Sequence, residues 1–266
     1  MCMEKITSRN NAYIKKIVKL SASSGERKKT NQFVLEGVRL CFDIINSDAV
    51  LLELFVTQDC YHKNREAVDR LAARSKKAFL IDGDCAARLA DTVSPQGLFC
   101  VCERIRATAQ IHEKGKYIAL ENIQDPSNLG AILRTAEALG MDGVILSGCT
   151  DAFSPKSLRA SMGALLRIEM LETDDLCALL TRCRNGGMKI LAAVPDRSAA
   201  DITKIDMHNG VICVIGNEGN GLTEAVKSLS SYLVTIKMSG RAESLNASVA
   251  ASIAMWEMMR GVGSGD

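Results

Sequence analysis

The sequence predicts an α/β protein in two parts, a smaller N-terminal α/β domain and a larger domain built on a mostly parallel sheet. Apolar segments of strand length alternate with segments of helical periodicity along the whole chain. In the second half the strand-like segments are continuous in Val, Ile and Leu, which is typical of parallel strands covered on both faces. A polar, non-periodic stretch between Arg106 and Lys116 marks the boundary. We therefore expect domains at 1–106 and 116–266, joined by a linker at 107–115.

The first half begins with a helix over residues 10–20, because Ile14, Ile17 and Val18 share one helical face opposite several lysines. A polar break follows. Beyond it the alternating pattern predicts strands at 33–37, 51–57, 77–81 and 97–104, and helices at 38–47, 64–74 and 84–91.

The second half repeats this alternation. An apolar stripe that starts at Leu129 and ends at Gly140 predicts a helix closed by a C-terminal glycine. We expect strands at 116–123, 143–148, 188–194, 211–215 and 232–237, and further helices at about 156–165, 174–184, 222–229 and 246–260.

The composition is that of an ordinary globular protein, with 47% apolar and 24% charged residues in 266. No apolar run approaches the ~20 residues of a membrane helix, and the start, MCMEKITSRN, lacks the apolar core of a secretory signal. The ten cysteines contain no C-x-x-C pair and only three histidines accompany them. These features indicate reduced cysteines in a cytoplasmic protein without a metal site.

Charge is distributed unevenly along the chain. Residues 1–30 contain eight basic and two acidic side chains, a net charge of +6, although the whole chain carries only +2. The remainder therefore carries −4. Such a basic segment is a candidate surface for RNA phosphates, and a solvated helix face explains the charge equally well. The candidate RNA-binding residues are Lys15, Lys16, Arg27, Lys28 and Lys29.

Three segments of the second half combine polar residues and glycines at the ends of expected strands, where ligands bind in open α/β sheets. They are 121–136 (ENIQDPSNLGAILRTA), 215–222 (IGNEGNGL) and 236–253 (IKMSGRAESLNASVAASI). Taken singly, the first favours an ordinary capped helix and the third fits a capped helix as well as a site. The second favours close approach of a ligand, but its G-x-x-G-x-G spacing differs from the G-x-G-x-x-G of dinucleotide sites.

Together, the order and spacing of these segments resemble the motifs of the SpoU (TrmH-like) branch of the SPOUT RNA methyltransferases. Residues 122–134 match N-x-x-D-P-x-N-x-G-x-x-x-R, and residues 216–221 match G-N-E-G-x-G. Residues 236–248 match I-P-M-x-G-x-x-E-S-L-N-x-S except that Lys237 replaces the proline, which predicts a less rigid loop. The first half resembles the ribosomal-protein-L30e-like substrate-binding domain that precedes many such enzymes.

The resemblance implies a C-terminal trefoil knot that binds S-adenosylmethionine among its loops, with glycines where side chains would obstruct the cofactor. It also implies a homodimer through the knotted domain, a ribose 2′-hydroxyl of RNA as acceptor, and neither a metal nor a membrane as partner. The implied cofactor-binding residues are Leu191, Ala192, Ala193, Ile215, Gly216, Asn217, Gly219, Ile236, Met238, Leu245 and Asn246.

The resemblance assigns the catalytic centre to Arg134. An arginine stays protonated in water, so we expect it to hold the attacking oxygen and stabilise developing negative charge rather than act as a free base. The residues expected to orient the nucleotide and this arginine are Asn128, Glu218, Ser244 and Asn246.

Other functions remain open at this point. A base methyltransferase of the same superfamily would share the fold, a non-catalytic RNA-binding protein would share the first domain, and a dehydrogenase would share the α/β architecture. The intact motif residues disfavour the second, and the glycine spacing disfavours the third. Ribosomal RNA is the expected substrate, with transfer RNA as the alternative.

Overall fold

The computed structural model describes residues 3–104 and 110–260, and its internal contacts divide it into two units. The first unit contains the described residues up to 104 together with Phe153–Leu166. The second contains the described residues from 110 to Ala152 and from Arg167 onward. The sequence placed 153–166 in the second domain, whereas by its packing this segment belongs to the first unit.

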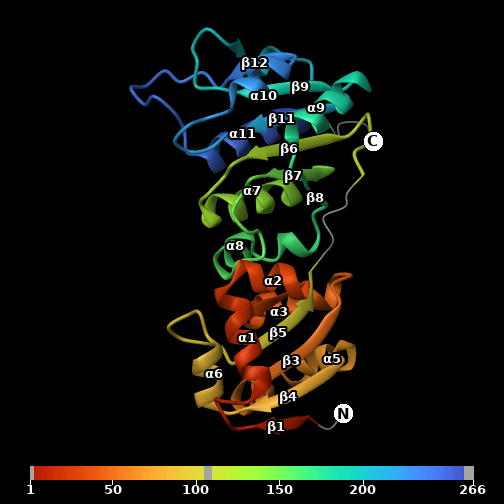
Figure 1. Cartoon of the computed structure of the whole chain (residues 1–266), viewed down its shortest axis with the longest axis vertical. Helices are drawn as coiled ribbons and strands as arrows, with labels where there is room; N and C mark the ends of the chain where they lie inside the picture. The colour runs from red at the N-terminus through yellow and green to blue at the C-terminus, as the bar shows by residue number, and fades with distance from the viewer. Residues whose placement is uncertain (1–2, 105–109, 261–266) are drawn as a thin grey trace. The chain divides into compact units, whose positions relative to one another are not determined.

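The first unit is built on a mixed five-stranded sheet in the order β1-β4-β3-β5-β2 (Figure 1). β1, β3 and β4 are parallel, whereas β5 pairs antiparallel with β3 and β2. The strands are β1 (Glu4–Ile6), β2 (Gln32–Glu36), β3 (Leu51–Thr57), β4 (Lys77–Ile81) and β5 (Leu98–Glu103). The helices are α1 (Ala12–Ala22), α2 (Ser24–Thr30), α3 (Val38–Asp43), the 3₁₀ turn η1 (Ile44–Asn46), α4 (Gln58–Lys63), α5 (Arg65–Arg74), α6 (Gly83–Leu89), α8 (Pro155–Ser161) and the 3₁₀ turn η2 (Ala164–Leu166).

The core of this unit explains its amphipathic helices. α1 buries Ile14, Ile17 and Leu20 completely against the sheet and α6. The expected polar break instead contains a helix, α2, because Ser23 caps its start and Asn31 ends it in the left-handed conformation. A short polar helix of this kind is set by its caps, so hydrophobic periodicity does not reveal it.

The segment 153–166 joins this unit through aromatic and ionic contacts. Phe153 packs against Phe33 of β2 with ring centroids 5.0 Å apart. Arg159 of α8 forms an ion pair of 2.7 Å with Asp91. The segment therefore extends the core of the first unit although it lies between two strands of the second unit in sequence.

The second unit contains a seven-stranded sheet, entirely parallel, in the order β10-β12-β9-β11-β6-β7-β8. β8 and β10 were not expected, because three and two residues are too few for a recognisable pattern. The strands are β6 (Lys116–Glu121), β7 (Gly143–Ser147), β8 (Met170–Glu172), β9 (Lys189–Ala193), β10 (Ala200–Asp201), β11 (Val211–Ile215) and β12 (Tyr232–Thr235). The helices are α7 (Pro126–Ala138), α9 (Leu176–Asn185), the 3₁₀ turn η3 (Ile202–Lys204), α10 (Glu224–Leu229) and α11 (Ala247–Met259).

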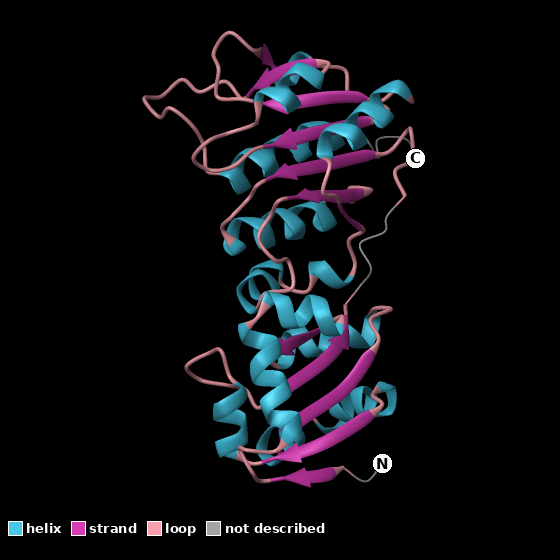
Figure 2. Ribbon diagram, viewed as in Figure 1, coloured by secondary structure: helices cyan, strands magenta, loops and turns pink. Residues whose placement is uncertain are grey.

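Helices cover both faces of this sheet (Figure 2). α9 and α10 share a buried cluster with Tyr117 and Ala119 of β6 and with residues of β9 and β11. α7 and α11 pack on each other and on β6, β7 and β11. Because side chains alternate along a strand, Lys116, Ile118 and Leu120 point to this second face. The expected parallel sheet, covered on both sides, is confirmed.

Two features are missing from the residues that the structure describes. None of the described helices combines the length and apolar character needed to cross a membrane. In the same residues, no three His, Cys, Asp or Glu side chains lie in position to hold a metal ion.

Candidate functional site

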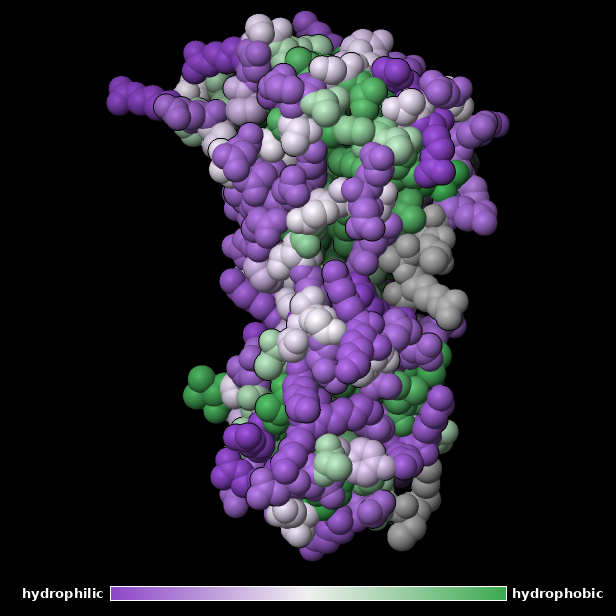
Figure 3. Space-filling model, in the orientation of Figure 1, coloured by the Kyte–Doolittle hydropathy of each residue, from purple (hydrophilic) through white to green (hydrophobic). Residues whose placement is uncertain are grey.

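Three loops of the second unit meet at the carboxyl ends of its central strands. They follow β6 (residues 122–125), β11 (216–222) and β12 (236–246), and hydrogen bonds join the first to each of the others through Asn128 and Glu218. The loop after β12 projects from the unit, at the left of Figure 1, and its outer surface is hydrophilic (Figure 3). We call these three segments the site loops. Each site loop lies within one of the three segments that the sequence singled out, 121–136, 215–222 and 236–253.

The loop after β11 is a tight turn that closes on itself. The backbones of Asn217 and Gly221 exchange two hydrogen bonds of 3.0 and 3.1 Å, and the Asn217 side chain accepts from the amides of Gly219 and Asn220. A Cβ atom at Gly216 would lie 2.3 Å from the carbonyl carbon of Gly221. Glycine at 216 is thus required by the loop itself, independently of a cofactor. At Gly219 the nearest atom would be 3.6 Å away, so the loop leaves that position open.

A chain of side-chain hydrogen bonds joins the site loops. The Asn246 Nδ2 group donates to Asn128 Oδ1 at 3.0 Å, and Asn128 Nδ2 donates to Glu218 Oε1 at 3.0 Å. Asn246 also caps α11, because its Oδ1 accepts from the amides of Ser248 and Val249. Each asparagine therefore has one defined orientation. The structure brings together three of the five residues that the resemblance placed at the catalytic centre.

Glu218 is the acceptor at the end of this chain. Burial alone would raise its pKa, but the hydrogen bond from Asn128 and the backbone amides of Gln124 and Asp125 outweigh it and lower the pKa below its ordinary value. Glu218 is consequently ionised at neutral pH and is a weak base. Its chemistry fits an anchor that holds the other two loops in place, rather than a group that removes a proton.

A cavity of about 390 Å³ opens between the loops that follow β9, β11 and β12. This volume lies in the range of small-molecule sites, and the lining combines apolar side chains with exposed backbone. Of the expected residues, those that line it are Ala193, Ile215, Gly216, Asn217, Gly219, Ile236, Met238, Leu245 and Asn246, together with Glu218 and Ser244. Leu191 and Ala192 do not line it, because both are fully buried inside β9.

The cavity fits S-adenosylmethionine in its chemistry. Ile236, Met238 and Leu245 offer an apolar wall for the adenine ring of the ligand, and the side chains of Ser244 and Asn246 on the lining offer hydrogen-bonding groups. Val194 and Pro195, which the sequence analysis did not single out, complete the wall. A plain Val-Pro after a strand carries no recognisable signal.

Arg134 lies apart from this chain of hydrogen bonds. It is exposed on α7 and is absent from the cavity lining. The structure shows no hydrogen bond or ion pair between Arg134 and another described residue. Its guanidinium is therefore available to a ligand, while the asparagines and Glu218 are held by one another.

Sequence reasoning missed a second carboxylate that supports the site. Glu121, the buried last residue of β6, accepts hydrogen bonds from the Thr223 amide at 2.9 Å and from its hydroxyl at 2.7 Å. This contact fixes the end of the loop after β11. A carboxylate within an apolar strand segment was the available signal, because a buried charge needs partners.

Lys237 takes the place of the proline in the family motif. Its ammonium lies 3.3 Å from Asp201, so an ion pair joins the loop after β12 to the end of β10. The Lys237 side chain is 70% exposed, and a pair so exposed stabilises by only ~0–1 kcal/mol.

The basic N-terminal segment divides into two groups. Lys15, Lys28 and Lys29 are exposed. Lys16 forms an ion pair of 2.8 Å with the buried Glu53. Arg27 is buried, and its guanidinium donates to the carbonyls of Leu20 and Ser21 at the end of α1. Arg27 therefore has a structural role, which corrects its assignment to the RNA-binding surface.

Comparisons with known proteins place both halves of the chain in known families. Residues 115–256 match the SpoU rRNA Methylase family, and residues 11–100 match the MRM3-like substrate binding domain. A tRNA/rRNA methyltransferase of Synechocystis, itself uncharacterised, is 33% identical over 258 residues, which cover 96% of this chain and 93% of that protein. The 23S rRNA (guanosine(2553)-2′-O)-methyltransferase RlmP of Bacillus subtilis is 29% identical, covering 96% and 99% of the two chains.

A crystal structure of an rRNA methyltransferase from Sinorhizobium meliloti with bound S-adenosylmethionine superposes with a TM-score of 0.86 at 27% identity, covering 98% of this chain and 99% of that one. The fold, the loops and the family match define one class, a two-domain SPOUT-type RNA methyltransferase. The chain belongs to the SpoU rRNA methylase family.

Proposed function

We propose that this protein transfers a methyl group from S-adenosylmethionine to a ribose 2′-hydroxyl of RNA, and that the RNA is ribosomal. The observation that carries this proposal is the chain Asn246–Asn128–Glu218, already assembled at the rim of a cavity suited to the cofactor. Relatives that are named as rRNA methyltransferases match nearly the whole chain, and they support the ribosomal substrate. Transfer RNA is the alternative substrate.

The bound cofactor supplies an electrophilic methyl group, so the protein has to align the acceptor oxygen and assist loss of its proton. Arg134, exposed and unengaged by described residues, holds the acceptor oxygen and stabilises its developing charge. Asn128 and Asn246 orient the nucleotide, and Ser244 lines the cavity together with Asn246. Glu218 remains ionised and holds the site loops together.

The homodimer of the family is part of the proposal. α11 presents a stripe with Val249 46% exposed, Ile253 partly exposed and Trp256 58% exposed. An apolar stripe of this kind on a helix that also packs inside the domain is suited to a second copy of the same helix. α7, which carries Arg134, packs beside α11, so a dimer through this face would bring the arginine of one copy near the other copy's site loops.

The trefoil knot and the cytoplasmic location also belong to the proposal. α11 follows β12, near one edge of the sheet, yet packs on β6 and β11 at its centre. The chain thus returns past the loop after β11 on its way from β12 to α11, which supports a knot in which this segment threads through that loop.

The proposal is tested with purified protein, ribosomal RNA fragments and S-adenosylmethionine. We expect calorimetry to detect binding of the cofactor and of its demethylated product but not of NAD, and RNA digests to contain one 2′-O-methylated nucleotide. Binding of NAD instead, or methylation of a base, would overturn it.

The same assay tests the role of Arg134. Replacement by Ala or Lys should lower methyl transfer by two or more orders of magnitude and leave cofactor affinity almost unchanged, because lysine lacks the planar fork of arginine. Replacement of Arg182, exposed on α9, serves as control. Equal losses of cofactor binding and turnover in the Arg134 variants would mark the arginine as structural.

A further inference from the structure

α11 packs on the sheet through residues that do little to fix its position along its own axis. The buried face consists of Ala247, Ala251 and Ala254, followed by Met255 and Met258. Alanines form a smooth surface, and methionine adapts to many shapes. Such a face can be well packed in more than one register along the helix, so directional contacts have to select one.

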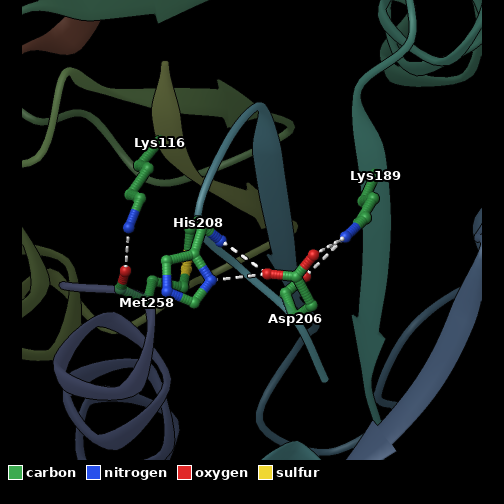
Figure 4. Close-up of polar contacts among 5 residues, drawn as sticks. All are labelled: Lys116, Lys189, Asp206, His208 and Met258. Carbon is green, nitrogen blue, oxygen red and sulfur yellow. Dashed lines mark hydrogen bonds and ion pairs between the residues drawn. The ribbon is translucent and has the colours of Figure 1, made fainter. Parts of the chain in front are cut away.

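Among the residues that the structure describes, two polar side-chain contacts link the part of α11 that follows Asn246 to other elements. Midway along the helix, the hydroxyls of Ser252 and Thr135 of α7 lie 3.1 Å apart. At its end, the Lys116 ammonium donates a hydrogen bond to the backbone carbonyl of Met258, as Figure 4 shows. The carbonyls in the last turn of a helix have no partner within the helix, and positive charge is favourable there.

The position of Lys116 is unusual for a lysine. It is the first residue of β6 and only 6% of its surface is exposed. Its backbone amide is held by Asp142 at 2.7 Å. Burial lowers the pKa of Lys116, and the carboxylates of Asp142 and Asp206 oppose that effect. Burying an ammonium costs free energy that an apolar residue would avoid, so its single bond to α11 requires an explanation.

We propose that Lys116 is a positioning residue, which fixes α11 along its axis so that Asn246 at the start of the helix meets Asn128. The thirteen residues of α11 form a rod of ~20 Å, and a helix transmits an axial displacement from one end to the other. The inference rests on the proposed role of Asn246 for its effect on catalysis. The position of the helix itself can be measured without that role.

The test compares two uncharged replacements of equal length. Lys116→Met removes the hydrogen-bond donor, whereas Lys116→Gln retains an N–H donor on a side chain as long as that of methionine and one bond shorter than that of lysine. The control is Lys189→Met. Lys189 lies nearby on β9, but its ammonium points to Asp206 and bonds to that carboxylate at 2.8 Å (Figure 4). Lys116→Met and Lys189→Met thus each remove one lysine, but only Lys116 forms a hydrogen bond to α11.

The first measurement is hydrogen exchange at the amides of Ser248 and Val249, which donate to Asn246. We expect exchange about tenfold faster in Lys116→Met, as for loss of one buried hydrogen bond. It should be intermediate in Lys116→Gln and unchanged in Lys189→Met. Unchanged exchange in Lys116→Met, or equally faster exchange in Lys189→Met, would overturn the proposal. If Lys116→Met does not fold, the exchange rates of Lys116→Gln and Lys189→Met are compared instead. Faster exchange in Lys116→Gln alone would support the proposal, and equal rates would overturn it.

The second measurement is methyl transfer by the same variants and by Asn246→Ala. We expect Lys116→Met to lower kcat about tenfold to a hundredfold, since displacement of a catalytic group by ~1 Å has effects of this size. In the Asn246→Ala background the same change should have no further effect. Faster amide exchange with unchanged turnover would support the positioning of α11 and overturn the catalytic role of Asn246 instead. Full additivity of the two losses would overturn the link between Lys116 and Asn246.

Discussion

At the residue scale, Glu218 illustrates how neighbours decide what a carboxylate can do. The sequence shows one acid among three glycines, which is compatible with a catalytic base. In the structure its two oxygens accept from Asn128 and from the amides of Gln124 and Asp125. Those bonds stabilise the ionised form, so the residue organises the site loops.

The pH dependence of stability should report this arrangement. The pKa of Glu218 is lower in the folded protein than its ordinary 4.5, so its ionised form stabilises the fold above that pH. The contribution is lost as the pH falls through the lowered pKa. We expect the wild-type advantage in unfolding free energy over Glu218→Gln to be constant from pH 6 to 8 and to shrink below about 4.5.

Chemical denaturation at several pH values measures this difference. Glu224→Gln is the matched control, because the Glu224 side chain is 87% exposed and pairs with Lys227 of its own helix. A difference for Glu218→Gln that stays the same down to pH 3 would contradict the lowered pKa.

At the scale of elements, the loop after β11 shows that one motif can contain glycines of different purpose. The family motif treats Gly216 and Gly219 alike. The structure distinguishes them, because a Cβ atom at the first would clash with the backbone of Gly221, whereas one at the second would be in ordinary contact with the Asn217 side chain at 3.6 Å. Backbone atoms cannot move aside as the end of a side chain can.

Replacement of each glycine by alanine should separate the two. Gly216→Ala should lower the free energy of unfolding by ~1–3 kcal/mol, as overpacking does, and weaken cofactor binding because the turn must open. Gly219→Ala should change stability by less than ~1 kcal/mol. Thermal unfolding of both variants tests this, and equal destabilisation would show that the self-contact of the loop is unimportant.

At the scale of the whole molecule, the two units divide charge between them. The exposed basic residues of the first 30 positions lie in the first unit. The remainder of the chain, residues 31–266, carries a net charge of −4. Lys15, Lys28 and Lys29 remain candidates for phosphate contacts, whereas Lys16 and Arg27 are engaged by the protein itself. RNA attraction and methyl transfer are thus expected to depend on different parts of the chain.

Changing Lys15, Lys28 and Lys29 together to Gln should reduce the salt dependence of RNA binding. The slope should fall by up to ~0.7 for each lost contact with single-stranded RNA, with cofactor affinity unchanged. The control changes three exposed basic residues of α4 and α5 to Gln, namely Lys63, Arg65 and Arg70. A reduced slope in the control alone would move the phosphate-binding surface to those helices.

Assembly is the second property of the whole molecule. Trp256→Glu should convert the proposed dimer to monomers, because a charge would be buried in the interface. Light scattering measures the mass, and Val93→Glu, at a fully exposed position in the first unit, serves as control. A dimer that persists in Trp256→Glu would place the interface elsewhere.

The sequence by itself determined the elements with strong periodicity and the three motifs. Continuous Val, Ile and Leu segments predicted the parallel sheet, and the spacing of Asn128, Glu218 and Asn246 led to the family before any contact was known. These features are local, or they repeat a pattern at fixed intervals. Hydrophobic periodicity and motif spacing can both be recognised along a single chain.

The tertiary structure alone decided which charged residues are exposed to solvent and which form contacts inside the fold. Arg27 and Lys116 look like ordinary surface cations in sequence, yet one caps α1 and the other holds the end of α11. The segment 153–166 likewise belongs to the first unit only through its packing. Lys116 and its partner Met258 are 142 positions apart in the chain. Contacts between such distant positions cannot be predicted from the spacing of residues along one sequence, because they form only when the chain is folded.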